Sequence, residues 1–331
     1  MPRASRVGSL HDSGDSQPTP GLTRTLSQRK PAPAWWRAYS GWANRHRNWV
    51  LTGPALVFVG LLIIVPLCYT LFLSFTNARD NLDLSNMKLV GLKNYVDVLT
   101  DTERFWPAAG RTVLFTVVVV IVEMVLGMGI ALLLRRPFVG QKFVRGIILL
   151  PLVATPVAVG MMWRLIFEPT IGFANQLLKW VGLPPQGWVS SAKQALPTLM
   201  FVDVWQWTPM VVLILLAGLA SLPEEPEEAS LIDGATTWKR FWYVTLPLMR
   251  PTVVAALVLR TIDAFKTFDI LFSMKGPGGG SMHEVETLNI YAYTENFFYT
   301  RYGQAAAILI VFFVLVLMLL ALQFLNRTKE T

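Results

Sequence analysis

Six long apolar stretches alternate with polar segments along the chain. They lie at about 51–75, 113–134, 144–167, 196–219, 252–272 and 304–325. At about 1.5 Å per residue, roughly 22 helical residues cover about 33 Å, enough to cross a hydrocarbon layer of about 30 Å. The stretches lack the alternation of a membrane barrel, and backbone groups in lipid must pair within their own segment. The pattern predicts an all-α, polytopic membrane protein with six transmembrane helices, kinked at Pro66, Pro151, Pro156 and Pro209.

Composition agrees with a lipid-embedded chain and excludes several kinds of site. Of 331 residues, 53% are hydrophobic and 15% are charged, whereas soluble domains carry about 25% charged residues. Cys68 is the single cysteine, which excludes a disulfide framework and a CxxC centre. The three histidines are far apart in sequence, and no residues have zinc-ligand spacing. We therefore expect no catalytic residue and no metal site.

Residues 1–50 form a polar tail rich in Ser, Pro and Arg, predicted to be partly disordered. Tryptophans gather near its end, as is typical of a membrane interface. A cleavable signal peptide has a short apolar core near the N-terminus, whereas the first apolar run here starts at about residue 50 and is about 25 residues long. We expect an uncleaved span, and three parts: the tail (1–50), a membrane domain (51–325) and a C-terminus (326–331).

Lysine and arginine counts predict the orientation. If both termini share one side, that side holds 17 Lys and Arg residues and the other side holds 9. Basic residues accumulate on the cytoplasmic side, so both termini are expected in the cytoplasm. The net charge of +8 lies close to the apolar stretches. It therefore indicates anionic lipids as partners, and no nucleic acid.

The predicted cytoplasmic loop 220–250 carries the strongest local pattern. Ser221 and Glu224 have the spacing of a helix capping box, and Gly234 interrupts the helical pattern. Pro247 and Pro251 mark the return to lipid. The loop is therefore predicted to form two short helices bent at Gly234. A helical stripe follows the bend, and it either packs on the bundle or serves a partner: Trp238, Phe241, Trp242 and Thr245.

The stretch Glu228–Ala235, with Phe241 and Leu246-Pro247, resembles the EAA loop of ABC-importer permeases. It departs from that pattern at Ser230, where the family has alanine. Further stretches at 90–102, 217–224, 260–273 and 303–308 resemble the carbohydrate subgroup, in particular the larger subunit of maltose-like importers. The resemblance covers about residues 50–325 and implies a type I ABC importer permease fold.

In this family the EAA loop is a coupling helix that docks into a groove of a cytoplasmic ATPase. The resemblance therefore implies ATPase coupling by a set of seven residues: Glu228, Ala229, Asp233, Gly234, Ala235, Trp238 and Phe241. This chain has no GxxxxGK[ST] phosphate loop, so ATP and Mg would bind to a separate ATPase subunit dimer and the chain itself is not an enzyme. Further implied partners are a second permease subunit, giving a heterodimer, and an extracytoplasmic substrate-binding lipoprotein on loops 76–112, 168–195 and 275–303.

Ionisable residues inside the predicted spans are expensive, at about 2.5–3.5 kcal/mol each near the bilayer centre, and therefore indicate function. Arg260 is predicted near the midplane, with Asp263 three residues on, so both are candidates for the pathway and can also pair with each other. Lys266 and Asp269 are interpreted as a gate or a local pair. Mutual pairing inside the bundle is the alternative for the whole set: Glu123, Arg164, Asp203, Arg260, Asp263, Lys266 and Asp269.

A carbohydrate needs polar side chains for its hydroxyls and flat aromatic faces for its CH surface. Two predicted span ends offer that mixture, and they complete the predicted substrate pathway with Arg260, Asp263 and Lys266: Trp163, Arg164, Asp203, Trp205 and Gln206. An interfacial aromatic belt is the alternative for the tryptophans.

Together these features favour the permease subunit of a bacterial ABC importer, forming half of the translocation pathway for a sugar or polyol. An ion-gradient-driven secondary transporter or channel is the alternative, because intramembrane acids suit a proton relay. Two features argue against this alternative: the intramembrane acids are matched by intramembrane bases, and the 220–250 loop would have no purpose in such a transporter. A membrane-embedded enzyme lacks any nucleophile constellation. The sequence does not specify the substrate, and Arg260 and Lys266 leave a phosphate derivative open.

Overall fold

The computed structural model describes residues 47–79 and 87–328. Most of the predicted basic tail and the last three residues of the chain lie outside the described residues. The chain divides into two units, residues 1–62 and residues 63–331. The first described helix, α2 (Arg47–Ser74), crosses this division. All other described elements belong to the second unit.

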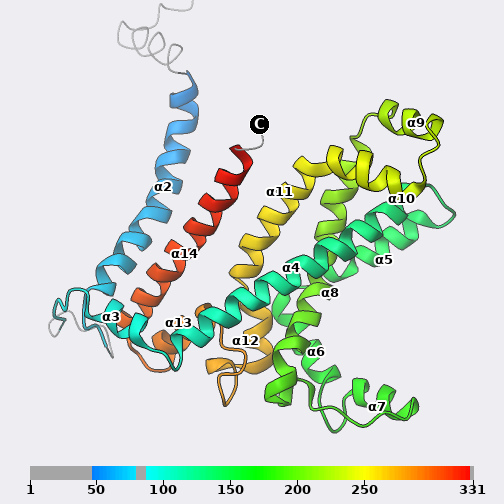
Figure 1. Ribbon diagram of the computed structural model, residues 1–331. Helices are drawn as coiled ribbons and strands as arrows, with labels where there is room; N and C mark the ends of the chain where they lie inside the picture. The colour runs from blue at the N-terminus through cyan, green and yellow to red at the C-terminus, as the bar shows by residue number, and fades with distance from the viewer. Residues whose placement is uncertain (1–46, 80–86, 329–331) are drawn as a thin grey trace, which may run out of the picture. The chain divides into compact units, whose positions relative to one another are not determined.

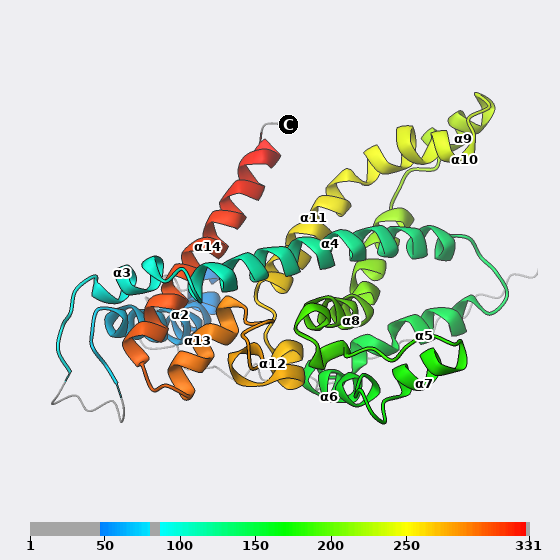
Figure 2. The same ribbon diagram turned by 60° about the horizontal axis from the view of Figure 1, so that its bottom comes forward.

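The second unit is built from helices, and in the described residues the β contact is an isolated bridge between Thr76 and Leu89. In Figures 1 and 2, α4 runs from the end that carries α3 and α13 to the end that carries α9 and α10. The helices after α2 are α3 (Lys93–Thr100), α4 (Phe105–Arg135), α5 (Gln141–Val153), α6 (Pro156–Ile166), α7 (Phe173–Trp180), α8 (Ala192–Ala220), α9 (Glu225–Ile232), α10 (Thr237–Arg240), α11 (Leu246–Phe265), α12 (Asp269–Lys275), α13 (Leu288–Phe297) and α14 (Tyr302–Thr328).

Five helical segments are long and apolar enough to cross a membrane, and each overlaps one of the six predicted spans. The third predicted span, 144–167, is wrong as a single helix. α5 and α6 are bent by 97°, because Thr155 is extended (φ −68°, ψ 142°) ahead of Pro156. The fifth predicted span is also interrupted: α11 ends at Phe265 and α12 begins at Asp269. The described residues thus hold five candidate spans, or six if the bent pair is one span.

The predicted pair of short helices in the 220–250 loop is correct for α9 but wrong for the second helix. α10 continues through a π-helical turn (Phe241–Thr245) into α11 without a break. A proline ring normally clashes with the carbonyl four residues before it. The wider π turn ahead of Pro247, closed by Leu246 N–H donating to Phe241 O, relieves that clash.

The core of the unit is formed where α4 packs along α8. Phe115 and Val119 of α4 are buried against Leu199 and Val202 of α8. Closer to the α9 end, Gly127 lets the helices approach, since a Cβ there would lie 2.7 Å from Val211 Cγ1. Small residues at such contacts are typical of helix pairs in membranes, where packing replaces the hydrophobic effect. α4 is therefore the helix against which the functional segments are positioned.

Candidate functional site

The stretch from Glu228 to Ala235 forms the last turn of α9 and the bend that follows it. Gly234 adopts a positive φ of 71°, which favours glycine because it lacks a Cβ. Ala235 N–H donates to Ser230 O at 2.9 Å and Gly234 N–H donates to Leu231 O at 3.1 Å. These are the two hydrogen bonds of a Schellman motif. The predicted bend at Gly234 is confirmed, whereas the capping box is wrong: α9 starts beyond Ser221, with Glu224 at its N-cap and no side-chain cap bond.

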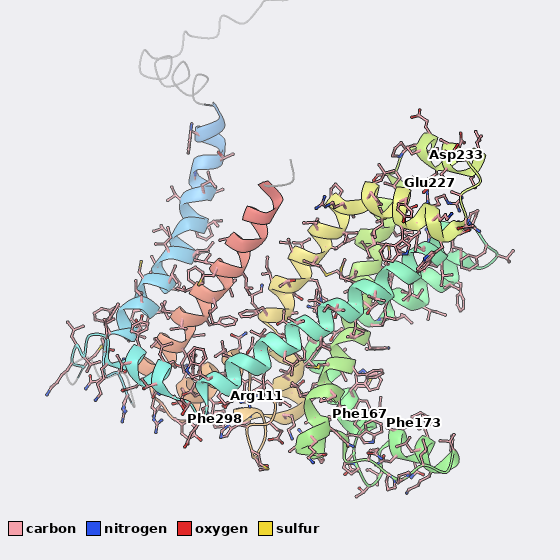
Figure 3. The ribbon with its side chains drawn as sticks, in the orientation of Figure 1. Arg111, Phe167, Phe173, Glu227, Asp233 and Phe298 are labelled. Carbon is pink, nitrogen blue, oxygen red and sulfur yellow. The ribbon has the colours of Figure 1, made fainter. Side chains whose placement is uncertain are left out.

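The outer face of α9 is open. Glu228, Ala229, Asp233 and Gly234 are exposed, and Ile232 is 87% exposed. Ser230 faces the other way: it is buried, and its hydroxyl donates to Glu227 O at 2.6 Å. The one departure from the family pattern therefore lies on the inner side of α9. Figure 3 shows Glu227 and Asp233 at the α9 end, far from Phe167 and Phe173 at the opposite end.

An ion pair attaches α9 to the end of α4. Arg135 Nη1 and Nη2 donate to the two carboxylate oxygens of Glu227 at 2.5 and 2.8 Å. The Thr245 hydroxyl adds a hydrogen bond to the same carboxylate at 3.3 Å. The Arg135 hydrogen bonds hold the pKa of the Glu227 carboxyl below its ordinary value. Sequence reasoning missed this pair, because it used Arg135 only to count charges.

The aromatic stripe after the bend is divided between the bundle and solvent. Thr245 is buried, and Phe241 is half-buried. Trp238 is 70% exposed and lies edge to face with Trp242, at 5.7 Å between ring centroids. The expected packing on the bundle is therefore confirmed for one side of the stripe, whereas a role of the exposed side toward a partner stays a prediction.

A cluster of four charged side chains joins α4, α8 and α11. The Arg260 guanidinium is 1% exposed and donates to Glu123 at 2.5 and 2.9 Å. It also donates to Asp203, and to Asp263 at 3.0 Å. The pairing of Arg260 with Asp263 is confirmed. The Arg260 head lies 5.3 Å from the centroid of the Trp207 ring.

A cavity of 240 Å³ opens beside this cluster, where the helix is interrupted between α11 and α12. The Asp263 side chain is 40% exposed and lines the cavity. Lys266 and Asp269 also line it, and in the described part of the chain neither forms an ion pair, so the predicted local pair is wrong. The interruption at 266–268 separates the two residues. The remaining lining residues are Pro156, Trp207, Thr267, Phe268 and Ile270.

The other predicted pathway residues lie outside this cavity. Trp163 contacts Trp205 edge to face, with ring centroids 5.4 Å apart. Arg164 is exposed, with no ion pair among the described residues. Gln206 is buried and donates to Ala154 O at 3.2 Å, so it satisfies a carbonyl at the bend between α5 and α6. Their part in a substrate pathway stays a prediction.

Trp207, Thr267 and Phe268 extend the site beyond the residues that the sequence singled out, and Glu123 joins it although the sequence did not assign it to the pathway. Glu123 carried a signal as an intramembrane acid. Trp207 adjoins the predicted Trp205 and Gln206, but sequence alone does not reveal which tryptophan faces Arg260. Thr267 and Phe268 reach the cavity only because α11 is interrupted there.

Comparison with known proteins gives one family. The model of the family described as "Binding-protein-dependent transport system inner membrane component" matches residues 123–329. The chain is 37% identical over 265 residues to the trehalose/maltose transport system permease protein MalF of Thermococcus litoralis, covering 80% of this chain and 88% of that protein. It is 32% identical to the trehalose transport system permease protein SugA of Mycobacterium tuberculosis, covering 87% and 91%.

A solved structure shares the fold. It is a chain of a bacterial ABC transporter involved in the import of the acidic polysaccharide alginate, with a TM-score of 0.75 and 20% identity. The superposition covers 88% of this chain and 99% of that chain. The predicted ABC importer permease fold is thereby confirmed.

Proposed function

The chain belongs to the family of binding-protein-dependent transport system inner membrane components, and we propose that it forms half of the translocation pathway of an importer for a carbohydrate. The exposed α9, bent at Gly234 and attached to α4 by the Arg135–Glu227 pair, carries this proposal. A separate ATPase dimer, which binds ATP and Mg, would grip α9 in the cytoplasm. A second permease subunit and an extracytoplasmic binding lipoprotein would complete the importer.

The relatives support a carbohydrate as the substrate. Two of them are named for transport of trehalose or maltose. These two disaccharides are therefore the first substrates to test. The solved structure resembles this chain at only 20% identity, so it supports the fold and says nothing about the cargo.

The cavity beside the charge cluster supports a sugar subsite. Asp263, Lys266 and Asp269 supply two carboxylates and an ammonium group around 240 Å³, and such groups exchange hydrogen bonds with hydroxyls. Trp207 and Phe268 supply aromatic faces for the CH surface of a sugar ring. A binding site of this kind near a helix interruption is typical of transporters. Arg260 would act as a positioning residue, because it holds Asp263 while its own head group is buried.

Two routes would carry motion from α9 to the cavity. The Arg135–Glu227 pair links α9 to α4, and the Glu123–Arg260 pair links α4 to α11. The continuous helix from α10 to α11 is the second route. Closure of an ATPase dimer on α9 would therefore move the helices that hold Asp263.

The conformation of Gly234 gives the first test. Valine is strongly disfavoured at a φ of 71°, so Gly234→Val should reduce ATP-dependent trehalose or maltose uptake at least about tenfold. Asparagine tolerates this conformation, so Gly234→Asn is the matched control and should retain most uptake. The assay uses proteoliposomes that hold both permeases, the ATPase and the lipoprotein. Wild-type uptake by Gly234→Val would count against coupling through α9. If vesicles without the ATPase still took up sugar, and an ionophore abolished that uptake, a secondary transporter would be favoured instead.

Asp263 gives a separate test of the cavity. Asp263→Ala should raise the KM for uptake about tenfold or more, since a charged hydrogen bond contributes about 1.5–3 kcal/mol. Stimulation of the ATPase by the loaded binding protein should persist, because α9 is untouched. Lys142→Ala is the control, as Lys142 is exposed and outside the cavity. Unchanged kinetics in Asp263→Ala for every tested sugar would remove Asp263 from the pathway.

A further inference from the structure

A second cavity, of 570 Å³, lies between the last turns of α4 and residues 237–245, which form α10 and the π turn after it (the α10 segment). Its walls are of two kinds. One wall is apolar and comes mainly from α4, and the other is polar and basic. The lining residues are Gly129, Leu132, Leu133, Arg135, Arg136, Thr237, Arg240, Phe241 and Thr245. Of the seven residues named above for ATPase coupling, Phe241 lines the cavity, whereas no residue of α9 does.

The lining of this cavity is positively charged, and Glu227, outside the lining, interacts electrostatically with Arg135 and Arg240. Its lining contains three arginines and no acidic residue. Arg135 is occupied by Glu227, which lies outside the lining. In the described part of the chain, Arg136 and Arg240 donate no side-chain hydrogen bond and form no ion pair. Two guanidinium groups therefore face the cavity with their donors free, and guanidinium forks match the geometry of phosphate oxygens.

The position of the cavity is that of a membrane surface. The apolar run of α4 ends at Leu134, immediately before Arg135 and Arg136. Close to the cavity, the α10 segment exposes Trp238, Trp242 and Tyr243 at 70%, 47% and 80%. Tryptophan and tyrosine with arginine at the end of an apolar helix are typical of the level of lipid headgroups.

We propose that this cavity binds the headgroup of an acidic phospholipid. The guanidinium groups of Arg136 and Arg240 would bind the phosphodiester, and the hydroxyl of Thr237, another lining residue, would donate to it. The start of an acyl chain would lie along Leu132, Leu133 and Phe241. A free phosphate would use the arginines but leave the apolar wall uncovered, so a lipid fits both walls. The site is independent of the transported substrate.

The test is native mass spectrometry of the purified full-length chain, titrated with phosphatidylglycerol in detergent micelles. The double variant Arg136→Gln/Arg240→Gln should bind phosphatidylglycerol about 25-fold more weakly, because each of the two contacts contributes about fivefold to the affinity. Lys142→Gln/Lys239→Gln is the matched control. It removes the same charge from exposed residues at the same end that do not line the cavity, and its affinity should change less than about twofold.

Further titrations distinguish binding of an acidic phospholipid from binding of any phospholipid and from binding of free phosphate. Phosphatidylcholine should bind at least about tenfold more weakly than phosphatidylglycerol, because it carries no net charge. Inorganic phosphate should not displace the lipid. Leu133→Ser keeps both arginines and should still weaken binding, because Leu133 belongs to the apolar wall. Each of three results would overturn the proposal: an equal loss of phosphatidylglycerol affinity in the two double variants, phosphatidylcholine binding as tight as that of phosphatidylglycerol, or displacement of the lipid by phosphate.

Discussion

The charge cluster predicts that Arg260→Met strongly destabilises the protein. Arg260 is the cation shared by Glu123, Asp203 and Asp263. Glu123 and Asp203 are both 0% exposed, so removing the guanidinium leaves two carboxylates buried without a counter-charge. Breaking one partner out of a buried pair costs about 3–5 kcal/mol. We therefore expect Arg260→Met to lose at least about that much free energy of unfolding.

Rescue variants distinguish the loss of an ion pair from a general loss of packing. Arg260→Met combined with Glu123→Gln and Asp203→Asn removes the unpaired charges and should recover most of the stability, because a buried ion pair and its neutral replacement differ little. Arg260→Lys should fall between the two. An ammonium is a point charge, whereas the guanidinium reaches Glu123, Asp203 and Asp263 through three separate nitrogens.

The measurement is thermal unfolding of the purified chain in detergent micelles, followed by tryptophan fluorescence. The expected order of stability is wild type, then the triple variant, then Arg260→Lys, and last Arg260→Met. Wild-type stability of Arg260→Met would refute the reasoning. So would a triple variant as unstable as Arg260→Met, because the loss would then come from volume and not from charge.

Two further predictions concern α4. The pKa of Glu227 is lowered by Arg135, so the attachment of α9 is fully formed above the ordinary carboxyl pKa and is lost as the pH falls below about 4. Amide hydrogen exchange of α9, corrected for the intrinsic rate, should therefore be faster at that low pH than at neutral pH. Glu227→Gln should show the faster exchange already at neutral pH. Exchange rates of α9 that change neither with pH nor in Glu227→Gln would contradict this prediction. Gly127→Ala should lower stability in micelles by about 1–3 kcal/mol because its Cβ meets Val211. Gly129→Ala meets nothing within 4 Å and should be neutral or gain up to about 1 kcal/mol, so equal effects of the two would refute the packing argument.

Local signals in the sequence predicted the parts of the fold that depend on neighbouring residues. An apolar run of sufficient length forms a helix in lipid whatever surrounds it, so five spans could be placed. Gly234 could be placed as a bend because a positive φ favours glycine in any tertiary context. The proline at 156 signalled a distortion, but a kink and a 97° bend have the same local sequence signature. The continuous α10–α11 helix was missed because the π turn that accommodates Pro247 has no such signature.

The candidate site depended on contacts between distant residues, and these were not predictable. Arg260 and Glu123 are 137 positions apart, and Arg135 and Glu227 are 92 apart. Charge balance indicated that intramembrane acids and bases pair, but not which ones. Lys266 and Asp269 have helical spacing, yet the helix is interrupted between them, so they line a cavity and do not pair. Partner choice is set by how α4, α8 and α11 pack, and a single sequence carries little of that information.

The two ion pairs on α4 also constrain how the helices around the cavity beside Asp263 could move. Glu123 and Arg135 are twelve residues apart on one helix, or about 18 Å. Glu123 holds α11 through Arg260, and Arg135 holds α9. Because α10 and α11 are continuous and residues 233–236 join α9 to α10, each of α9, α4 and α11 is linked to the other two. A force on α9 should therefore shift this group as one body. If the cavity is the proposed sugar subsite, its opening or closing would require movement of that body against the other helices.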